Sequence, residues 1–171
     1  VGNGISMRAI VDLAPKCEAF ICMRPEEWLI WNSIKKTWLV DKGVDLEVFH
    51  PMDNVEKLSG EPAVLYCESW RQQRNPLYLC VAMQEVYKQY PNARLHLYNV
   101  QDKRMFDTFN ALIKHNKWWV FCRSLQGTVA DIAELINRAD IVVSCLDPLI
   151  ARTPLEALAC GKAAVCPGYR A

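Results

Sequence analysis

Apolar runs of strand length alternate with segments of helical periodicity through most of the chain. Short runs rich in Val, Ile, Leu and aromatic residues predict buried strands. Between them, apolar residues recur at helical spacing, which predicts amphipathic helices. The expected strands cover residues 63–68, 95–100, 118–122, 141–145 and 163–166. The expected helices begin near residues 75, 102, 127 and 153. This strict alternation predicts an α/β fold with a doubly wound parallel sheet.

The first part of the chain has a shorter pattern of the same kind. Residues 19–23 and 37–40 predict two strands, with a helix that begins at Pro25 between them. Residues 52–61 are polar and indicate a linker before the strand at residue 63.

Composition narrows the class of protein. Half of the 171 residues are apolar and the net charge is +1, so no electrostatic footprint for nucleic acid stands out. No apolar run predicts a transmembrane segment. The eight cysteines form no C-x-x-C pair and the three histidines do not cluster, so we expect free, buried thiols and no metal site. These features favour a cytoplasmic protein, with peripheral attachment of a full-length protein to a membrane left open.

Residues 137–168 hold the most informative pattern. A strand leads into a loop, a helix opens at Thr153-Pro154, Gly161 ends that helix, and another buried strand follows. Thr153 and Glu156 have the spacing of a capping box, in which each side chain bonds a free backbone N–H of the first turn. The loop lies at the carboxyl end of a strand, where open α/β sheets bind ligands, and a helix N-terminus favours anions.

The same stretch resembles the signature of retaining glycosyltransferases of the GT-B fold, family 4. Residues 155–161, Leu-Glu-Ala-Leu-Ala-Cys-Gly, match its second half. Residues 40–51 resemble the segment that joins the two domains of that family. The resemblance implies the end of an acceptor-side domain over 1–41, a linker over 42–61, and a Rossmann-like donor domain over 62–171. This second domain of a GT-B fold would be truncated at its end.

The resemblance also implies roles for single residues. Glu156 would hold the ribose of a nucleotide-sugar donor, a role that competes with the capping box for the same carboxylate oxygens. Arg74 aligns with a family Lys that neutralises the donor diphosphate, and Arg71 stands close to the position of a family Arg. Arg152 and Thr153, at the mouth of the helix, are further candidates for the diphosphate.

The expected site for the donor sugar departs from the family pattern. Asp147 is the candidate sugar ligand, one residue earlier than the family acid, whose position is taken by Pro148. Ser69 stands at the family Arg position and Ala151 replaces the loop Gly. An ordinary role as a loop-turn residue remains open for Asp147. No catalytic residue is identified.

The expected activity is metal-independent glycosyl transfer, with a nucleotide-sugar as substrate and no cofactor. The acceptor would bind a missing N-terminal domain, so the isolated chain is expected to be inactive. Two alternatives remain: a non-catalytic nucleotide- or phosphate-binding module, which the three departures favour, and a nucleotide-sugar epimerase, which would need further acids and a His. The nucleotide base, the sugar and the acceptor are not indicated by the sequence.

Overall fold

The computed structural model describes residues 11–68, 77–98, 107–108, 110–111, 119–121, 128–145 and 151–167. Contacts within the chain divide it into two compact units: unit 1 ends at Gly43, and unit 2 begins at Val44. In the described part, every helix is too short or too polar to cross a membrane.

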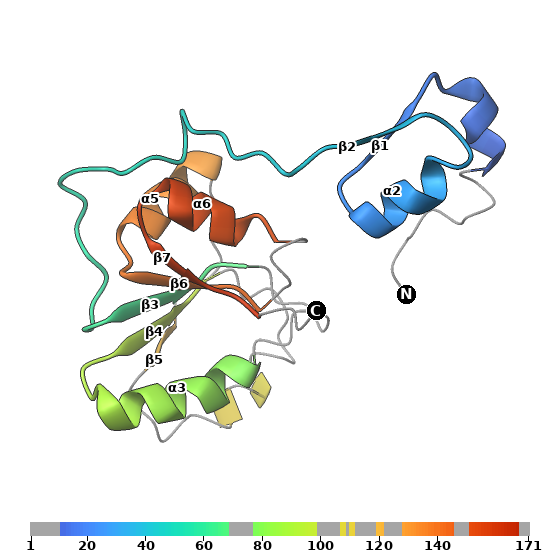
Figure 1. The fold of residues 1–171 in the computed structure, drawn as a ribbon. Helices are drawn as coiled ribbons and strands as arrows, with labels where there is room; N and C mark the ends of the chain where they lie inside the picture. The colour runs from blue at the N-terminus through green and yellow to red at the C-terminus, as the bar shows by residue number, and fades with distance from the viewer. Residues whose placement is uncertain are drawn as a thin grey trace. The chain divides into compact units, whose positions relative to one another are not determined.

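Unit 1 is a small β-α-β motif, and its elements match the expected order (Figure 1). The two strands pair in parallel, and a helix connects the first strand to the second. Its elements are a 3-10 turn η1 (Ala14–Lys16), β1 (Phe20–Cys22), α2 (Pro25–Trp31) and β2 (Thr37–Leu39).

Helix α2 is fastened to one face of the two strands. The indole Nε1 of Trp28 donates to the carbonyl oxygen of Thr37 at 2.9 Å. The ring of Trp31 meets the ring of Phe20 edge-on, with centroids 6.2 Å apart. Edge-on aromatic pairs of this kind add to the free energy of burial. These contacts place α2 on the face of the sheet to which Phe20 points.

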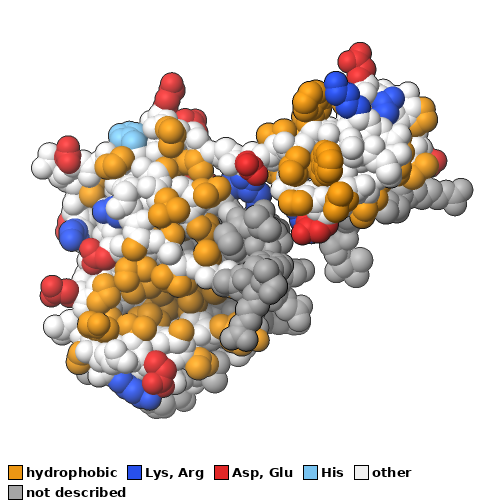
Figure 2. Space-filling view, viewed as in Figure 1, with side chains coloured by type: hydrophobic (Ala, Val, Ile, Leu, Met, Phe, Trp, Pro, Cys, Tyr) orange, Lys and Arg blue, Asp and Glu red, His pale blue; other side chains and the backbone are white. Residues whose placement is uncertain are grey.

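The other face of unit 1 is apolar and uncovered among the described residues. Ile21 and Trp38 are register partners and point away from the α2 side, with 73% and 54% of their surface exposed. Figure 2 shows apolar side chains gathered over this unit. Parallel strands usually have both faces covered, so this small sheet departs from the common pattern.

Unit 2 contains a five-stranded sheet in the order β5-β4-β3-β6-β7, with every pair parallel. From β3 the chain runs outward to β5, returns past β3, and then runs outward on the other side to β7 (Figure 1). The direction reverses between β3 and β6, which is the switch point of a doubly wound sheet. The expected fold class is confirmed. The strands are β3 (Ala63–Tyr66), β4 (Arg94–Leu97), β5 (Trp119–Phe121), β6 (Ile141–Val143) and β7 (Ala163–Val165).

Helices cover both faces of this sheet. Helix α3 (Leu77–Gln89) lies on one face, and α5 (Val129–Asn137) and α6 (Thr153–Ala159) lie on the other (Figure 1). Successive residues of a strand point to opposite faces, so an all-apolar run fits a strand buried on both sides. On β3, Val64 joins the cluster of α3 whereas Leu65 joins that of α5 and α6.

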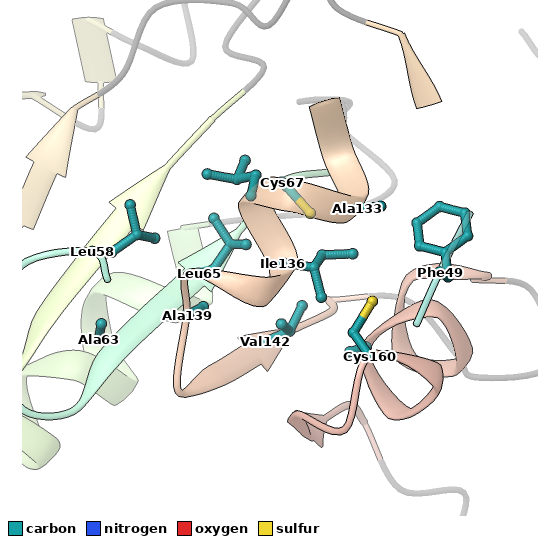
Figure 3. Packing of buried hydrophobic residues seen from close by; sticks show 12 residues of the cluster. Phe49, Leu58, Ala63, Leu65, Cys67, Ala133, Ile136, Ala139, Val142 and Cys160 are labelled. Atoms are coloured by element: carbon teal, nitrogen blue, oxygen red, sulfur yellow. The ribbon is translucent and has the colours of Figure 1, made fainter. Parts of the chain in front are cut away.

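Figure 3 shows the core under α5 and α6, where Leu65 of β3, Val142 of the neighbouring β6 and Ile136 of α5 point toward one another.

Helix α5 has a complete capping box, because Thr128 and Asp131 bond each other's backbone N–H. This cap fixes the start of α5 and so aims its apolar side at the sheet.

Residues 44–61, which fall in the range expected to be a linker, belong to unit 2 and contribute to its core. Phe49 and Leu58 are buried, with 4% and 8% of their surface exposed. The amide of buried Asn137, at the end of α5, accepts from the backbone N–H of Met52 and donates to the carbonyl of His50, both at 3.0 Å.

Candidate functional site

The carboxyl ends of β3 and β6 form the candidate site, because they flank the switch point of the sheet. In open α/β sheets the strands on either side of such a point leave a crevice, and ligands bind there. Cys67 and Glu68 follow β3 directly, and Ser144 and Cys145 follow β6. Helix α6, which carries Glu156, comes next along the chain and packs on β6 and β7.

The start of α6 differs from the expected capping box. Arg152 is the N-cap residue, with helical dihedrals (φ −87°, ψ −29°) and no side-chain capping bond. Its carbonyl accepts from the N–H of Glu156 at 3.0 Å. A capping side chain needs an extended backbone at the cap residue. Thr153 already belongs to the first turn, so the prediction that Thr153 and Glu156 form a capping box is wrong.

The Glu156 carboxylate is therefore not engaged in capping. Its side chain is half-buried and makes no hydrogen bond to another residue of the described ranges. Burial raises the pKa of Glu156, the charge of Glu68 raises it further, and the guanidinium of Arg152 opposes both. A half-buried carboxylate that makes no hydrogen bond within the described ranges, near the strand ends at the switch point, is suited to accept hydrogen bonds from hydroxyl groups of a ligand.

Glu68 is the residue that the sequence analysis missed. It has only 4% of its surface exposed, and its Oε1 accepts a hydrogen bond from the hydroxyl of Ser144 at 2.7 Å. The signal for it was present, because an acid and a hydroxyl residue each follow an all-apolar strand directly. The carboxyl ends of parallel strands meet at one edge, so such residues converge there even when they are far apart in sequence.

Two thiols beside these acids have strongly raised pKa values. Burial, with the charges of Glu68 and Glu156, raises the pKa of Cys67 to about 12. Burial and the charge of Glu68 raise the pKa of Cys145 to about 12. Because the thiolate is the reactive form, neither thiol is suited to act as a nucleophile near neutral pH.

The remaining expected ligands fall in two groups. Arg152 and Thr153 stand beside Glu156 at the start of α6. Arg152 is exposed and Thr153 is half-buried. Ala151, where the glycosyltransferase signature has Gly, is 4% exposed. Three other candidates and two of the departures lie outside the described residues: Arg71, Arg74, Asp147, Ser69 and Pro148.

A hollow lies at the opposite, amino-terminal edge of the sheet. It has a volume of about 770 Å³, and its lining includes Lys57, Glu61, Tyr90 and Asp140. Asp140 there is occupied structurally, because its carboxylate accepts from the N–H of Ala63 at 2.9 Å and from Lys57 at 3.2 Å. Size alone does not make a site, and the carboxyl edge is the better candidate because it holds a half-buried acid without such partners.

The described ranges contain no group of three or more His, Cys, Asp or Glu side chains placed to hold a metal ion. The polar groups that they do bring together at the carboxyl edge are carboxylates, a hydroxyl and a guanidinium. Such groups suit the binding of a ligand that carries both hydroxyl groups and an anion.

Known protein families and curated proteins give no match to this sequence. Solved structures do match. Sucrose-phosphate synthase from Thermosynechococcus elongatus superposes with a TM-score of 0.73 at 19% identity, over 93% of this chain and 43% of that one. The C-terminal domain of a glycosyl transferase group 1 family protein from Francisella tularensis gives 0.61 at 21% identity, over 72% and 70%.

The chain shares its fold with GT-B glycosyltransferases. A third example is HepE from Anabaena, solved with UDP and glucose, which gives a TM-score of 0.67 at 16% identity. The matched region covers 93% of this chain and 47% of HepE. This chain thus spans less than half of the synthase and of HepE. At such identities the likeness shows the Rossmann-like fold of the glycosyltransferase domain.

Proposed function

We propose that this chain is the donor-binding part of a glycosyltransferase and binds a nucleoside diphosphate sugar. The observation that carries the proposal is the position of Glu156. It is half-buried, takes no part in capping, and belongs to the helix that follows β6 at the switch point. The shared fold supports the same function, because several of the similar structures are glycosyltransferases, and HepE was solved with UDP-glucose.

Glu156 binds the ribose in this proposal. A carboxylate has two oxygens, and each accepts one hydrogen bond from the neighbouring 2′ and 3′ hydroxyl groups. Ribose hydroxyls donate to an acid in a similar way in other nucleotide-binding α/β folds. Partial burial strengthens such bonds, because less water competes for the oxygens.

The cations near the start of α6 bind the diphosphate. Arg152 is the described cation next to Glu156, and its guanidinium can bond two phosphate oxygens at once. The hydroxyl of Thr153 is a further donor. Arg71 and Arg74, on the segment after β3, complete the positive charge in this proposal, and Asp147 binds the sugar. The leaving nucleotide gains negative charge as the glycosidic bond breaks, so these cations also favour the reaction.

The proposed reaction is transfer with retention of configuration, without a metal, as in family 4. Transfer needs donor and acceptor held together in one geometry. We propose that the acceptor binds another part of a longer protein, since similar glycosyltransferases are about twice the length of this chain.

Calorimetry with UDP, GDP and ADP tests the proposed binding, with the nucleoside monophosphates as references. Arg152→Gln is expected to weaken diphosphate binding about tenfold through loss of a charge-assisted bond. Lys57→Gln is the matched control, because it removes one exposed cation from the opposite edge of the sheet. Equal loss in both variants, or no binding of any diphosphate, would contradict the proposal. Transfer of labelled sugar by a full-length protein then separates an enzyme from a binding module.

A further inference from the structure

Buried His96 is fastened to the turn before β3. It has 3% of its surface exposed. Its neighbours Leu95 and Leu97 on β4 join the cluster of α3, so His96 points to the opposite face of the sheet. The ring nitrogen Nε2 lies 2.6 Å from the carbonyl oxygen of Ser59. A carbonyl oxygen only accepts hydrogen bonds, so Nε2 carries the proton of the neutral ring.

The other ring nitrogen of His96 is unpartnered. Nδ1 is buried and makes no hydrogen bond to the described residues. While the ring is neutral, Nδ1 holds only a lone pair, and its burial without a donor costs little compared with burial of a charge. Once the ring is protonated, Nδ1 becomes an N–H donor on a buried cation, and the described residues offer it no acceptor. Protonation in the buried position is therefore strongly disfavoured.

A strap, residues 56–61, separates His96 from the solvent. Ser59, in the middle of the strap, is exposed, whereas the ring that its carbonyl contacts is buried. The N–H of Glu61 ties the end of the strap to the carbonyl of Asn92 at 2.9 Å. The strap also forms part of the wall of the hollow at the amino edge. Displacement of the strap would thus bring water to the ring without disruption of the sheet.

A fixed cation acts on the ring from the end of α5. The charged or titratable residues of the described elements around the ring are Glu56, Lys57 and Glu61 of the strap, Tyr66 of β3, Arg94 of β4, Asp131 and Glu134 of α5, and Arg138 and Asp140 after it. Among these, Arg138 acts on His96, and its Nε donates to the carbonyl of Glu56 at 2.8 Å, which keeps its charge beside the strap. A proton on His96 would be a second positive charge at this place.

We propose that His96 is a pH-sensitive pin, which holds the strap at the amino edge while it is neutral and releases the strap when it is protonated in mild acid. The open strap exposes the ring to water, so the open state takes up a proton that the closed state excludes. This device does not depend on the proposed function. It would change the wall of the hollow between neutral and mildly acidic conditions.

The sign of the pH dependence follows from the folded environment. Burial lowers the pKa of His96, the bond to Ser59 opposes this effect, and the charge of Arg138 lowers the pKa further. A histidine with a lowered pKa in the closed state leaves the closed state fully stable above the ordinary His value of about 6.5. The closed strap then loses stability as the pH falls below that value, until the buried ring is itself protonated.

The tautomer and the titration of His96 are the first test. NMR of the ring nitrogens should show the proton on Nε2 at about pH 7.5, and a titration midpoint below the ordinary value of about 6.5. His50 is an exposed histidine and gives a reference in the same spectra. A proton on Nδ1 of neutral His96, or an ordinary midpoint, would overturn the inference.

Hydrogen exchange measures release of the strap. The N–H groups of Leu58 and Glu61 report the strap, because each donates to a backbone carbonyl outside it, and the N–H of Tyr98, bonded to Tyr66, reports the sheet. After correction for the intrinsic exchange rate, protection of Leu58 and Glu61 should fall by up to about tenfold for each pH unit below about 6.5, because opening takes up one proton. Protection of Tyr98 should fall less. Equal loss at all three groups, or protection independent of pH, would overturn the inference.

A variant that cannot titrate completes the experiment. His96→Gln keeps an N–H donor for the carbonyl of Ser59 but has no proton to gain, so the pH dependence of protection at Leu58 and Glu61 should disappear. His50→Gln is the matched control and should keep it. Retention of the pH dependence in folded His96→Gln would overturn the proposal. If His96→Gln does not fold, the comparison of strap and sheet within the wild type decides.

Discussion

Two carboxylates on opposite edges of the same sheet have opposite environments. Asp140, at the amino edge, accepts from the backbone N–H of Ala63 and from Lys57, and these bonds lower its pKa. Glu156, at the carboxyl edge, is half-buried and makes no such bond within the described ranges, and burial raises its pKa against the opposing charge of Arg152. A group that is satisfied by the fold stabilises it, whereas a group left unsatisfied is available to a ligand.

The backbone repeats the same contrast. At the amino edge the turn before β3 is tied by several bonds, including Glu61 N–H to the carbonyl of Asn92 at 2.9 Å and Leu58 N–H to that of Arg138 at 2.9 Å. The carboxyl edge gathers polar side chains instead. The comparison teaches that the described bonds of this sheet tie its amino edge, whereas its carboxyl edge holds the acid that we propose binds a ligand.

The largest effect is expected from Gly60→Ala, at the amino edge. Gly60 has a φ of +110°, and an added Cβ would lie 2.8 Å from the backbone nitrogen of Arg94. Strain and overlap together should lower the free energy of unfolding by on the order of 3 kcal/mol in urea denaturation. Gly43→Ala is the matched control, since an added Cβ there meets no atom within 4 Å. Equal loss in both would mean that the turn before β3 is not a rigid part of the fold.

Glu156→Gln should act on binding at the carboxyl edge. Loss of a charge-assisted bond to ribose is expected to weaken nucleoside diphosphate binding about tenfold. A 2′,3′-dideoxy nucleotide should bind wild type and variant about equally, because it has no hydroxyls for Glu156. Calorimetry with both ligands measures this. Unchanged diphosphate affinity, or an equal loss for the dideoxy ligand, would remove the ribose role.

The pH dependence of stability should have opposite signs at the two edges. Asp140 has a lowered pKa, so its stabilisation is present above the ordinary Asp pKa and is lost as the pH falls through the folded value. Glu156 has a raised pKa, so its ionisation costs stability above the folded value, and the cost disappears in acid. At neutral pH, Asp140→Asn should be less stable and Glu156→Gln slightly more stable than wild type, each by under about 1 kcal/mol.

Thermal or urea unfolding at several pH values measures these differences, and both should shrink toward zero in acid. Two differences of the same sign at neutral pH would break the comparison between the edges.

The smallest effect concerns the thiols of the carboxyl edge, which should not react in the folded protein. With pKa values of about 12, roughly one thiol in ten thousand of Cys67 or Cys145 is ionised at about pH 8. Alkylation followed by peptide mass mapping should find both unmodified in native protein, whereas Cys17 and Cys166, which are partly exposed, should be labelled first. All eight should react after denaturation. Rapid labelling of Cys67 would show that this edge opens in solution.

Much of the fold was predictable because strand signals are local. An all-apolar run such as β3 is buried on both faces by helices that the same chain supplies, so its pattern is visible without knowledge of its neighbours. The alternation of strands and helices predicted a doubly wound parallel sheet, whereas the order β5-β4-β3-β6-β7 is known from the structure alone.

The errors share a different cause, because each depended on residues distant in sequence or on exact dihedrals. Thr153 has the right spacing for a capping box, but the backbone at Arg152 is already helical. Glu68 was missed because its meaning depends on Ser144, 76 residues later. Roles at a site of this kind are set by convergence in space, which local patterns do not contain.

The hydrogen bonds of Asn137 to Met52 and His50 have a consequence for synthesis of the chain. The backbone N–H of Met52 gains its hydrogen-bond partner only when Asn137, 85 residues further on, has been synthesised. At ribosomal rates of about 5–20 residues per second, that interval lasts roughly 4–17 seconds. During this time Phe49 and Leu58 have no core to enter, so the newly made segment is an apolar stretch open to chaperones or to other nascent chains. A segment that is buried in the finished protein is thus exposed while the protein is being made.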